Sequence, residues 1–134
     1  MSAQQEPRRP RCVRVPESTQ HGGARLVAIR SDGVDLELEM ESDAGGVRVR
    51  FRDVVGFRVL EERELCEFWN DYATPNGWLW EVHEGGWLDL ERTRATFGSL
   101  RLPLREWLVV DDRCVSVIGE NPPELREIAR GSGE

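Results

Sequence analysis

The fold is decided by residues 34–52, VDLELEMESDAGGVRVRFR, in which two runs of alternating apolar and charged residues flank a Gly-Gly pair. An alternation of period two places the apolar side chains on one face of a β-strand and the charged side chains on the other. The apolar positions are Val34, Leu36, Leu38 and Met40, then Val47, Val49 and Phe51 after a loop at 42–46. The stretch therefore predicts an antiparallel hairpin with one buried face.

The charges on the outer face of this hairpin predict its register. The first run carries acids and the second carries arginines. A register with Met40 opposite Val49 makes three acid–base pairs, Glu41 with Arg48, Glu39 with Arg50, and Glu37 with Arg52. A slide by two residues keeps this complementarity, whereas a slide by one would bury charges. Each exposed pair contributes at most about 1 kcal/mol, so the main effect of the pairs is on register.

Further short apolar runs on both sides of the hairpin predict a sheet of several strands. Strands are expected at 12–16, 24–30, 54–60 and 77–83, and a second hairpin at 106–111 and 113–119. In the strand at 77–83, Trp78, Trp80 and Val82 are expected to share one face. Residues 87–101 fit either a strand or a short helix. The expected fold class is α+β, dominated by an antiparallel sheet arranged as a meander or a partly open barrel.

One main helix is expected at about 61–72, packed on the sheet. Its first turn is acidic, as the helix dipole favours, and an apolar stripe follows at helical spacing, formed by Leu65, Phe68, Trp69 and Tyr72. The chain of 134 residues fits one domain. We expect a disordered tail at 1–10, the domain at 11–124, and a C-terminal tail at 125–134 in a Pro-led segment that would allow a short helix.

The net charge of −7 is unevenly distributed along the chain. Residues 60–91 contain nine acids and one arginine, whereas residues 1–30 are net positive. A strongly negative field repels phosphate backbones, so nucleic-acid binding through the central stretch is disfavoured and a basic protein partner is favoured.

The remaining composition favours a cytoplasmic protein without bound cofactors. No apolar run approaches the roughly 20 residues that span a bilayer, and no secretory signal begins the sequence. Three widely separated cysteines argue against a disulfide framework. The two histidines, His21 and His83, lie in different segments with no cysteine near either, so neither a metal site nor a cofactor is expected.

The sequence contains no familiar catalytic motif. The motifs HExxH, GxSxG and GxxxxGK[ST] are absent. Carboxylates are abundant at 61–91, and two of them across a cleft could act on a glycosidic bond, although a solvated acidic surface explains the same residues. His83, beside a Gly-Gly turn and near carboxylates, keeps a small hydrolase or lyase open as an alternative.

Three segments carry a resemblance to a known class of protein. They are FRDVVGFRVLEERELCEFW at 51–69, GWLWEVHEGGWLDLE at 77–91 and EWLVVDDRCVSVIGENPPE at 106–124. In this order they resemble small bacterial immunity proteins of polymorphic-toxin systems. The resemblance implies a non-enzymatic cytoplasmic protein that neutralises one cognate toxin, expected to be basic and nuclease-like, by covering its active site.

On this interpretation the central stretch holds the recognition surface. The residues predicted to bind the partner are Glu64, Glu67, Trp69, Asp71, Trp78, Glu84, Trp87 and Asp89. Trp78 is also explained as a core residue, and Trp87 is the ring most expected at the surface. A homodimeric ligand-binding protein is the remaining alternative, which predicts a long exposed apolar strand edge paired across a two-fold axis.

Overall fold

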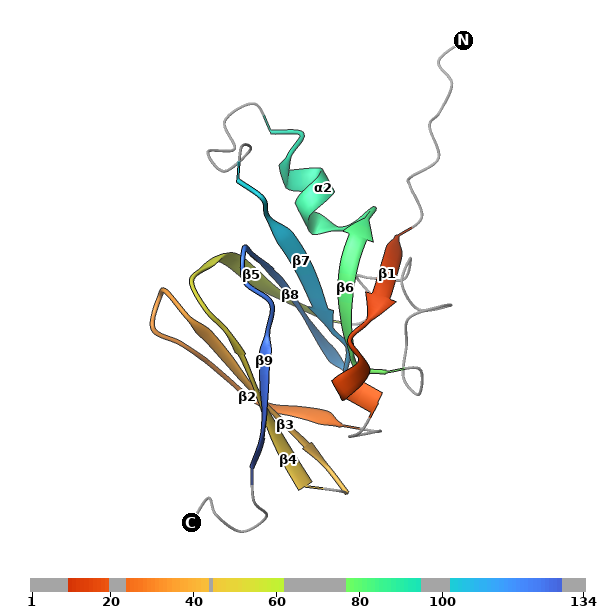
Figure 1. Ribbon diagram of the computed structural model, residues 1–134, viewed down its shortest axis with the longest axis vertical. Helices are drawn as coiled ribbons and strands as arrows, with labels where there is room; N and C mark the ends of the chain where they lie inside the picture. The colour runs from red at the N-terminus through yellow and green to blue at the C-terminus, as the bar shows by residue number, and fades with distance from the viewer. Residues whose placement is uncertain (1–9, 20–23, 44, 62–76, 95–101, 129–134) are drawn as a thin grey trace.

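Two antiparallel β-sheets make up the protein (Figure 1), for which a computed structural model describes residues 10–19, 24–43, 45–61, 77–94 and 102–128. The strand orders are β1-β6-β7-β8-β5 in the five-stranded sheet and β2-β3-β4-β9 in the four-stranded sheet. The first sheet contains β1 (Arg11–Arg14), β6 (Leu79–Glu84), β7 (Arg105–Val109), β8 (Arg113–Gly119) and β5 (Val54–Glu61). The second contains β2 (Arg25–Ser31), β3 (Leu36–Ser42), β4 (Gly45–Phe51) and β9 (Glu124–Ile128). The α+β class is confirmed, and these sheets do not close into a barrel.

The hairpin at 34–52 forms as β3 and β4 with the predicted buried face. Six of its seven apolar side chains lie in the core, namely Leu36, Leu38, Met40, Val47, Val49 and Phe51. Val34 is the exception, because it is 53% exposed and precedes the strand. It lies in a turn where Asp32 Oδ1 accepts hydrogen bonds from the backbone N–H groups of Val34 and Asp35.

The register of the hairpin differs by two residues from the predicted one. Met40 lies opposite Val47, so Glu39 faces Arg48 and Glu37 faces Arg50. The strands run as far as Ser42 and Gly45, and the Ser42 hydroxyl donates to the Gly45 carbonyl at 3.0 Å. The connection is therefore shorter than the predicted loop, which moves the pairing by two while keeping acids opposite bases.

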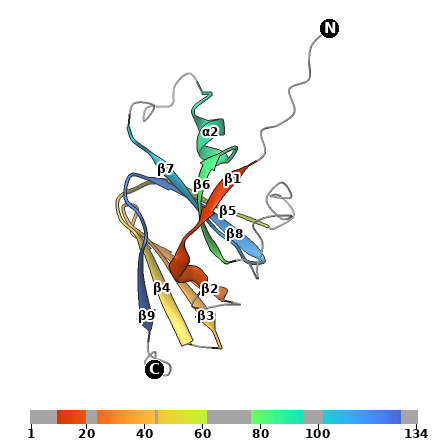
Figure 2. The same cartoon turned by 45° about the vertical axis from the view of Figure 1, so that its right-hand side comes forward.

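The main core lies between the two sheets. Side chains of β3 and β4 meet Trp78, Leu79, Trp107, Val109, Val115 and Val117 of the five-stranded sheet and its approach. The rings of Phe51 and Trp107 lie 5.8 Å apart and join β4 to β7. In Figure 2, α2 (Trp87–Glu91) stands at the end of the five-stranded sheet away from the four-stranded sheet.

A second apolar cluster contains residues that alternate with those of the main core along β6 and β7. It comprises Trp80, Val82, Leu108, Val110 and Cys114. Trp78 does not belong to it, so the predicted shared face of Trp78, Trp80 and Val82 is wrong for Trp78. Trp78 precedes β6, where its carbonyl accepts a hydrogen bond from the Val110 N–H, and its side chain packs in the main core.

The other predicted elements divide into three groups. The strands at 12–16, 24–30, 54–60 and 77–83 and the second hairpin are confirmed as β1, β2, β5, β6 and the β7–β8 pair. The segment at 87–101, which fitted either a strand or a short helix, begins with the short helix α2. Near the C-terminus, strand β9 forms in place of the short helix that was considered, because the backbone of β9 pairs with the edge of β4. The predicted helix at 61–72 lies outside the described residues, apart from Glu61, which ends β5.

Membrane-spanning helices are missing from the part of the chain that the structure describes, since no helix there has the length and apolarity to cross a bilayer.

Candidate functional site

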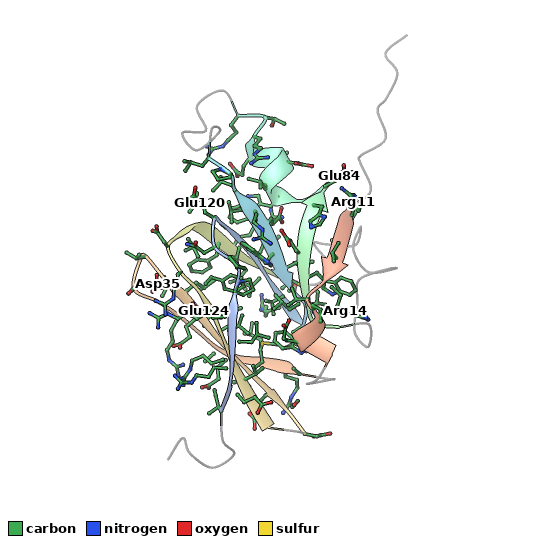
Figure 3. All side chains as sticks on the ribbon, in the orientation of Figure 1. Arg11, Arg14, Asp35, Glu84, Glu120 and Glu124 are labelled. Carbon is green, nitrogen blue, oxygen red and sulfur yellow. The ribbon has the colours of Figure 1, made fainter. Side chains whose placement is uncertain are left out.

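A cavity of about 250 Å³ opens where β1, β6, β7 and α2 meet, and we call it the α2 cavity. Glu84 and Asp89, two residues predicted to bind a partner, line it. His83 and the Glu81–Arg105 ion pair also contribute to its walls. Figure 3 shows Arg11 and Glu84 side by side where β1 runs along β6. The cavity therefore brings the main candidates of the sequence to one end of the five-stranded sheet.

Arginines from distant parts of the chain neutralise the acids around the cavity. Arg105 donates two hydrogen bonds to the Glu81 carboxylate, at 2.7 and 2.9 Å, which lower the pKa of Glu81. Arg11 lies 3.6 Å from Glu84, and Arg94 forms an ion pair with Glu91. Three acids of the stretch 60–91, Glu81, Glu84 and Glu91, are thus paired with arginines.

Glu106, on β7, is the most deeply buried acid of the cavity, at 2% exposure. Its two carboxylate oxygens accept hydrogen bonds from the first two residues of α2, from Leu88 N at 2.8 Å and from Trp87 N at 3.2 Å. Burial raises the pKa of Glu106, although these two hydrogen bonds and the charge of Arg58 oppose the shift. Glu106 therefore holds the beginning of α2 against the sheet.

A glycine makes this contact possible. Gly86 is the N-cap residue of α2 and provides no side-chain cap. A Cβ atom at this position would lie 2.6 Å from Glu106 Oε1 and 2.7 Å from Val82 Cγ1. The close approach of Gly86 to β6 and β7 is what allows the Glu106 carboxylate to reach the N–H groups of the next two residues.

Two contacts hold the ring of Trp87, which is only partly buried. Its indole Nε1 donates to Glu91 Oε1 at 3.0 Å, and the guanidinium carbon of Arg58 lies 5.0 Å from the ring centroid. A Cβ atom at Gly56 of β5 would lie 3.6 Å from the ring, an ordinary contact distance. Its neighbour Leu88 is buried with Leu104 and Ile118. The ring is therefore a fixed part of the surface rather than a freely rotating side chain.

The predicted partner-binding residues fall into three groups. Glu84, Trp87 and Asp89 lie close together at β6 and α2, where Asp89 Oδ2 also accepts the Gly85 N–H at 2.8 Å. Trp78 is 0% exposed, so its ring has no surface to offer a partner and its role is in the core. Glu64, Glu67, Trp69 and Asp71 lie outside the described residues.

Sequence reasoning missed Glu106, Arg105 and Arg11 as parts of this site. Glu106 had one signal, because it opens the apolar run EWLVV and precedes a buried tryptophan on the same strand. A carboxylate at the start of an apolar strand is a candidate to be buried, and a buried carboxylate needs hydrogen-bond donors. The two arginines had no local signal, since they reach the cavity only through the pairing of β1 and β7 with β6.

The chemistry available at the cavity is limited. His83 Nε2 lies 3.6 Å from Glu81 Oε1, and its side chain is 36% exposed. Burial raises the pKa of Cys12 to about 12, which disfavours its reactive thiolate. In the described ranges no group of three or more His, Cys, Asp or Glu residues is arranged to hold a metal ion.

Strand β2 forms an edge of the four-stranded sheet and exposes Val27 and Ile29 by 47% and 37%. Asp111 Oδ2 accepts the Leu26 N–H at 2.8 Å, and the pairing with β3 shifts register between Leu26 and Ala28. An irregular edge with an occupied N–H group is a poor template for pairing with a second chain. At β2, the edge expected for the homodimer alternative is seven residues long and interrupted by this register shift.

Comparisons with protein-family models, with curated proteins and with solved structures give no match to this chain.

Proposed function

We propose that the chain is a non-enzymatic protein-binding module, specifically an immunity protein that neutralises a basic bacterial toxin. The end of the five-stranded sheet around α2 is part of its contact surface. The observation that carries this proposal is the proximity of Glu84, at the end of β6, to Trp87 and Asp89 on α2, a helix that is held by Glu106. A surface already ordered before binding loses less conformational entropy in a complex.

The chemistry around α2 suits a protein interface. Leu90 exposes 63% of its surface on the same short helix as Trp87. Charged groups from β1 and β6 line the α2 cavity next to this helix. An apolar centre with a polar rim is the usual anatomy of a protein–protein interface, which buries about 1,600 Å² in total when it is stable.

Expression beside the product of the adjacent gene tests the biological role. We expect that product to arrest growth of the host, and the full chain to restore growth and to co-purify with it in a defined ratio. Growth arrest that persists when both proteins are expressed and folded would contradict the role as an immunity protein.

Reversal of one charge tests the contact surface. Glu84→Lys is expected to slow association with the partner several-fold at low ionic strength, and the difference should shrink at high ionic strength, because salt screens electrostatic steering. The side chains of Arg11 and Glu84 are 62% and 49% exposed, so loss of their ion pair should change the free energy of unfolding little. Surface plasmon resonance gives the association rates.

Glu41→Lys is the matched control for this measurement. Glu41 is an exposed strand glutamate opposite Arg25, as Glu84 is opposite Arg11, but it lies in the four-stranded sheet. It should leave the association rate nearly unchanged. Equal slowing by both variants would mean that net charge alone matters and that the α2 surface is not the contact.

A hydrolase or lyase is the second candidate, and one observation favours it. His83 lies on β6 and lines a cavity with Glu81 nearby, instead of standing on an open turn. If the chain cleaves chromogenic esters, phosphate esters or glycosides, His83→Gln should lower the rate by at least about 100-fold, as expected for loss of a general acid or base. His21→Gln is the control, and equal activity of both variants would exclude His83 from the reaction.

A further inference from the structure

The attachment of α2 depends on a few contacts. The helix has five residues, too few to be stable alone, and Gly86 supplies no side-chain cap. It is held by Leu88, which packs with Leu104 and Ile118, and by the Glu106 carboxylate, which accepts its first two N–H groups. Glu106 is therefore the main polar anchor of α2 on the sheet.

The same contact removes the Glu106 carboxylate from water. With α2 in place the residue is 2% exposed, and Gly86 and Leu88 of the α2 segment approach its oxygens closely. Burying a charged carboxylate is costly, whereas a protonated carboxyl group is much less so. The two N–H donors and Arg58 compensate only in part, because the pKa of Glu106 is raised despite them.

We propose that α2 is a latch whose docking on β7 is linked to proton uptake by Glu106, so that α2 docks more tightly as the pH falls and loosens as the pH rises. The latch rests on the burial of Glu106 and on its two hydrogen bonds to α2. Its role in regulating the surface around Trp87 and Asp89 rests on the proposed function.

The direction follows from the two states of the latch. In the docked state the pKa of Glu106 lies above its ordinary value of 4.5, and in the undocked state water returns the carboxyl group toward that value. Because the docked state has the higher proton affinity, the stability that protonation adds to docking is fully present below the ordinary pKa. It is lost as the pH rises through the raised pKa.

Charged and titratable groups face Glu106 from several elements. Arg58 of β5 stabilises the charged carboxylate, and Asp89 of α2 opposes it. Cys12 of β1 also interacts with Glu106, but its pKa of about 12 keeps it neutral across the relevant pH range. Val82 and Ile118, the neighbours of Glu106 on β6 and β8, are apolar. The same cavity is also lined by further charged or titratable side chains, namely Arg11, Glu81, His83, Glu84, Arg92 and Arg105.

Docking of α2 determines the shape of the α2 cavity. Leu88 and Asp89 of the helix form one of its walls, opposite His83 and Glu84 of β6. Movement of the latch would therefore change the cavity and the position of Trp87 at the same time. A partner that contacts α2 in its docked position would bind more tightly at lower pH.

Hydrogen exchange of the full chain, without any partner, tests the latch. The backbone amides of Trp87 and Leu88 report docking directly, because they donate to Glu106. After correction for the intrinsic exchange rate, their protection should increase as the pH falls, by at most about tenfold per pH unit for one linked proton. Amides in the middle of β3 serve as the reference for global stability.

Glu106→Gln separates proton linkage from simple packing. The neutral amide has nearly the same shape and can still accept the Leu88 N–H, so α2 should stay docked with protection that no longer depends on pH. His83→Gln should keep the wild-type pH profile. The latch is overturned if Glu106→Gln and wild type show the same profile, or if the carbon NMR signal of the Glu106 carboxyl group titrates at or below the ordinary pKa.

The outcome is independent of the proposed function. A flat wild-type profile would remove the latch while leaving partner binding untouched. Failure to bind a toxin would remove the proposed function while leaving the pH profile of α2 as it is.

Discussion

Truncation of Trp107 to alanine is expected to lower the free energy of unfolding by about 3–5 kcal/mol, the usual cost of removing a large buried aromatic side chain. Trp107 is 1% exposed and meets Phe51 of the opposite sheet in the main core. Removal of the ring would leave an empty space between the two sheets, whose attachment to each other depends on this core. A domain of this size is stable by only about 5–15 kcal/mol in total, so the variant should lose a large share of its stability.

Urea denaturation followed by circular dichroism measures this effect. Val27→Ala is the control, because Val27 is also an apolar strand residue but is 47% exposed at the edge of the four-stranded sheet. It should change stability by less than about 0.5 kcal/mol. The free energy of unfolding of Trp107→Ala could instead fall by less than about 1 kcal/mol, with an unchanged slope of that free energy against urea concentration. This result would contradict a core that joins the two sheets at Trp107.

Substitution of Gly86 by alanine is expected to destabilise the protein by about 1–3 kcal/mol through overpacking. The backbone of Gly86, with φ −105° and ψ −159°, is open to any residue, so the effect is steric and not conformational. The added Cβ would lie less than 3 Å from both Glu106 oxygens and from Val82 Cγ1, at 2.6, 2.9 and 2.7 Å. Either α2 or the Glu106 carboxylate must move.

Hydrogen exchange at Trp87 and urea denaturation together detect this change, with early exchange at α2 as the expected signature. Gly119→Ala is the matched control, since its Cβ would meet Val54 Cα at an ordinary 3.5 Å. Gly86→Ala and Val82→Ala combined should cost less stability than the sum of the two separate losses, because Val82→Ala removes one of the colliding atoms. Wild-type protection of Trp87 in Gly86→Ala would show that the contact between Gly86 and Glu106 is not needed for docking.

Much of the fold could be predicted because period-two patterns report burial locally. In the hairpin at 34–52, every second side chain is apolar, and the chain has to bury that face to remain in water. The same reasoning placed β1, β2, β5, β6 and the β7–β8 hairpin. Strand β9 was not predicted, because ELREI has no strict alternation and becomes a strand by pairing with the edge of β4.

The candidate site was predictable only in part. Glu84, Trp87 and Asp89 are close in sequence, so their proximity in space required only a strand, a turn and a short helix. Trp87 was already the ring most expected at the surface, whereas Trp78 was predicted to bind a partner and also explained as a core residue, because its burial depends on which layer covers its ring. The exposures of Trp78 and its neighbours are decided by the second sheet.

By itself the sequence determined the hairpin at 34–52 and which of its faces is buried, because these depend on side chains one or two residues apart. The tertiary structure alone decided the charge balance of the site, because it brings Arg11 and Arg105 from separate strands to Glu84 and Glu81. It also decided the role of Glu106, whose partners are the backbone N–H groups of α2. Electrostatic and hydrogen-bonding partners act through space, so the charge of a window of sequence does not give the charge of a surface.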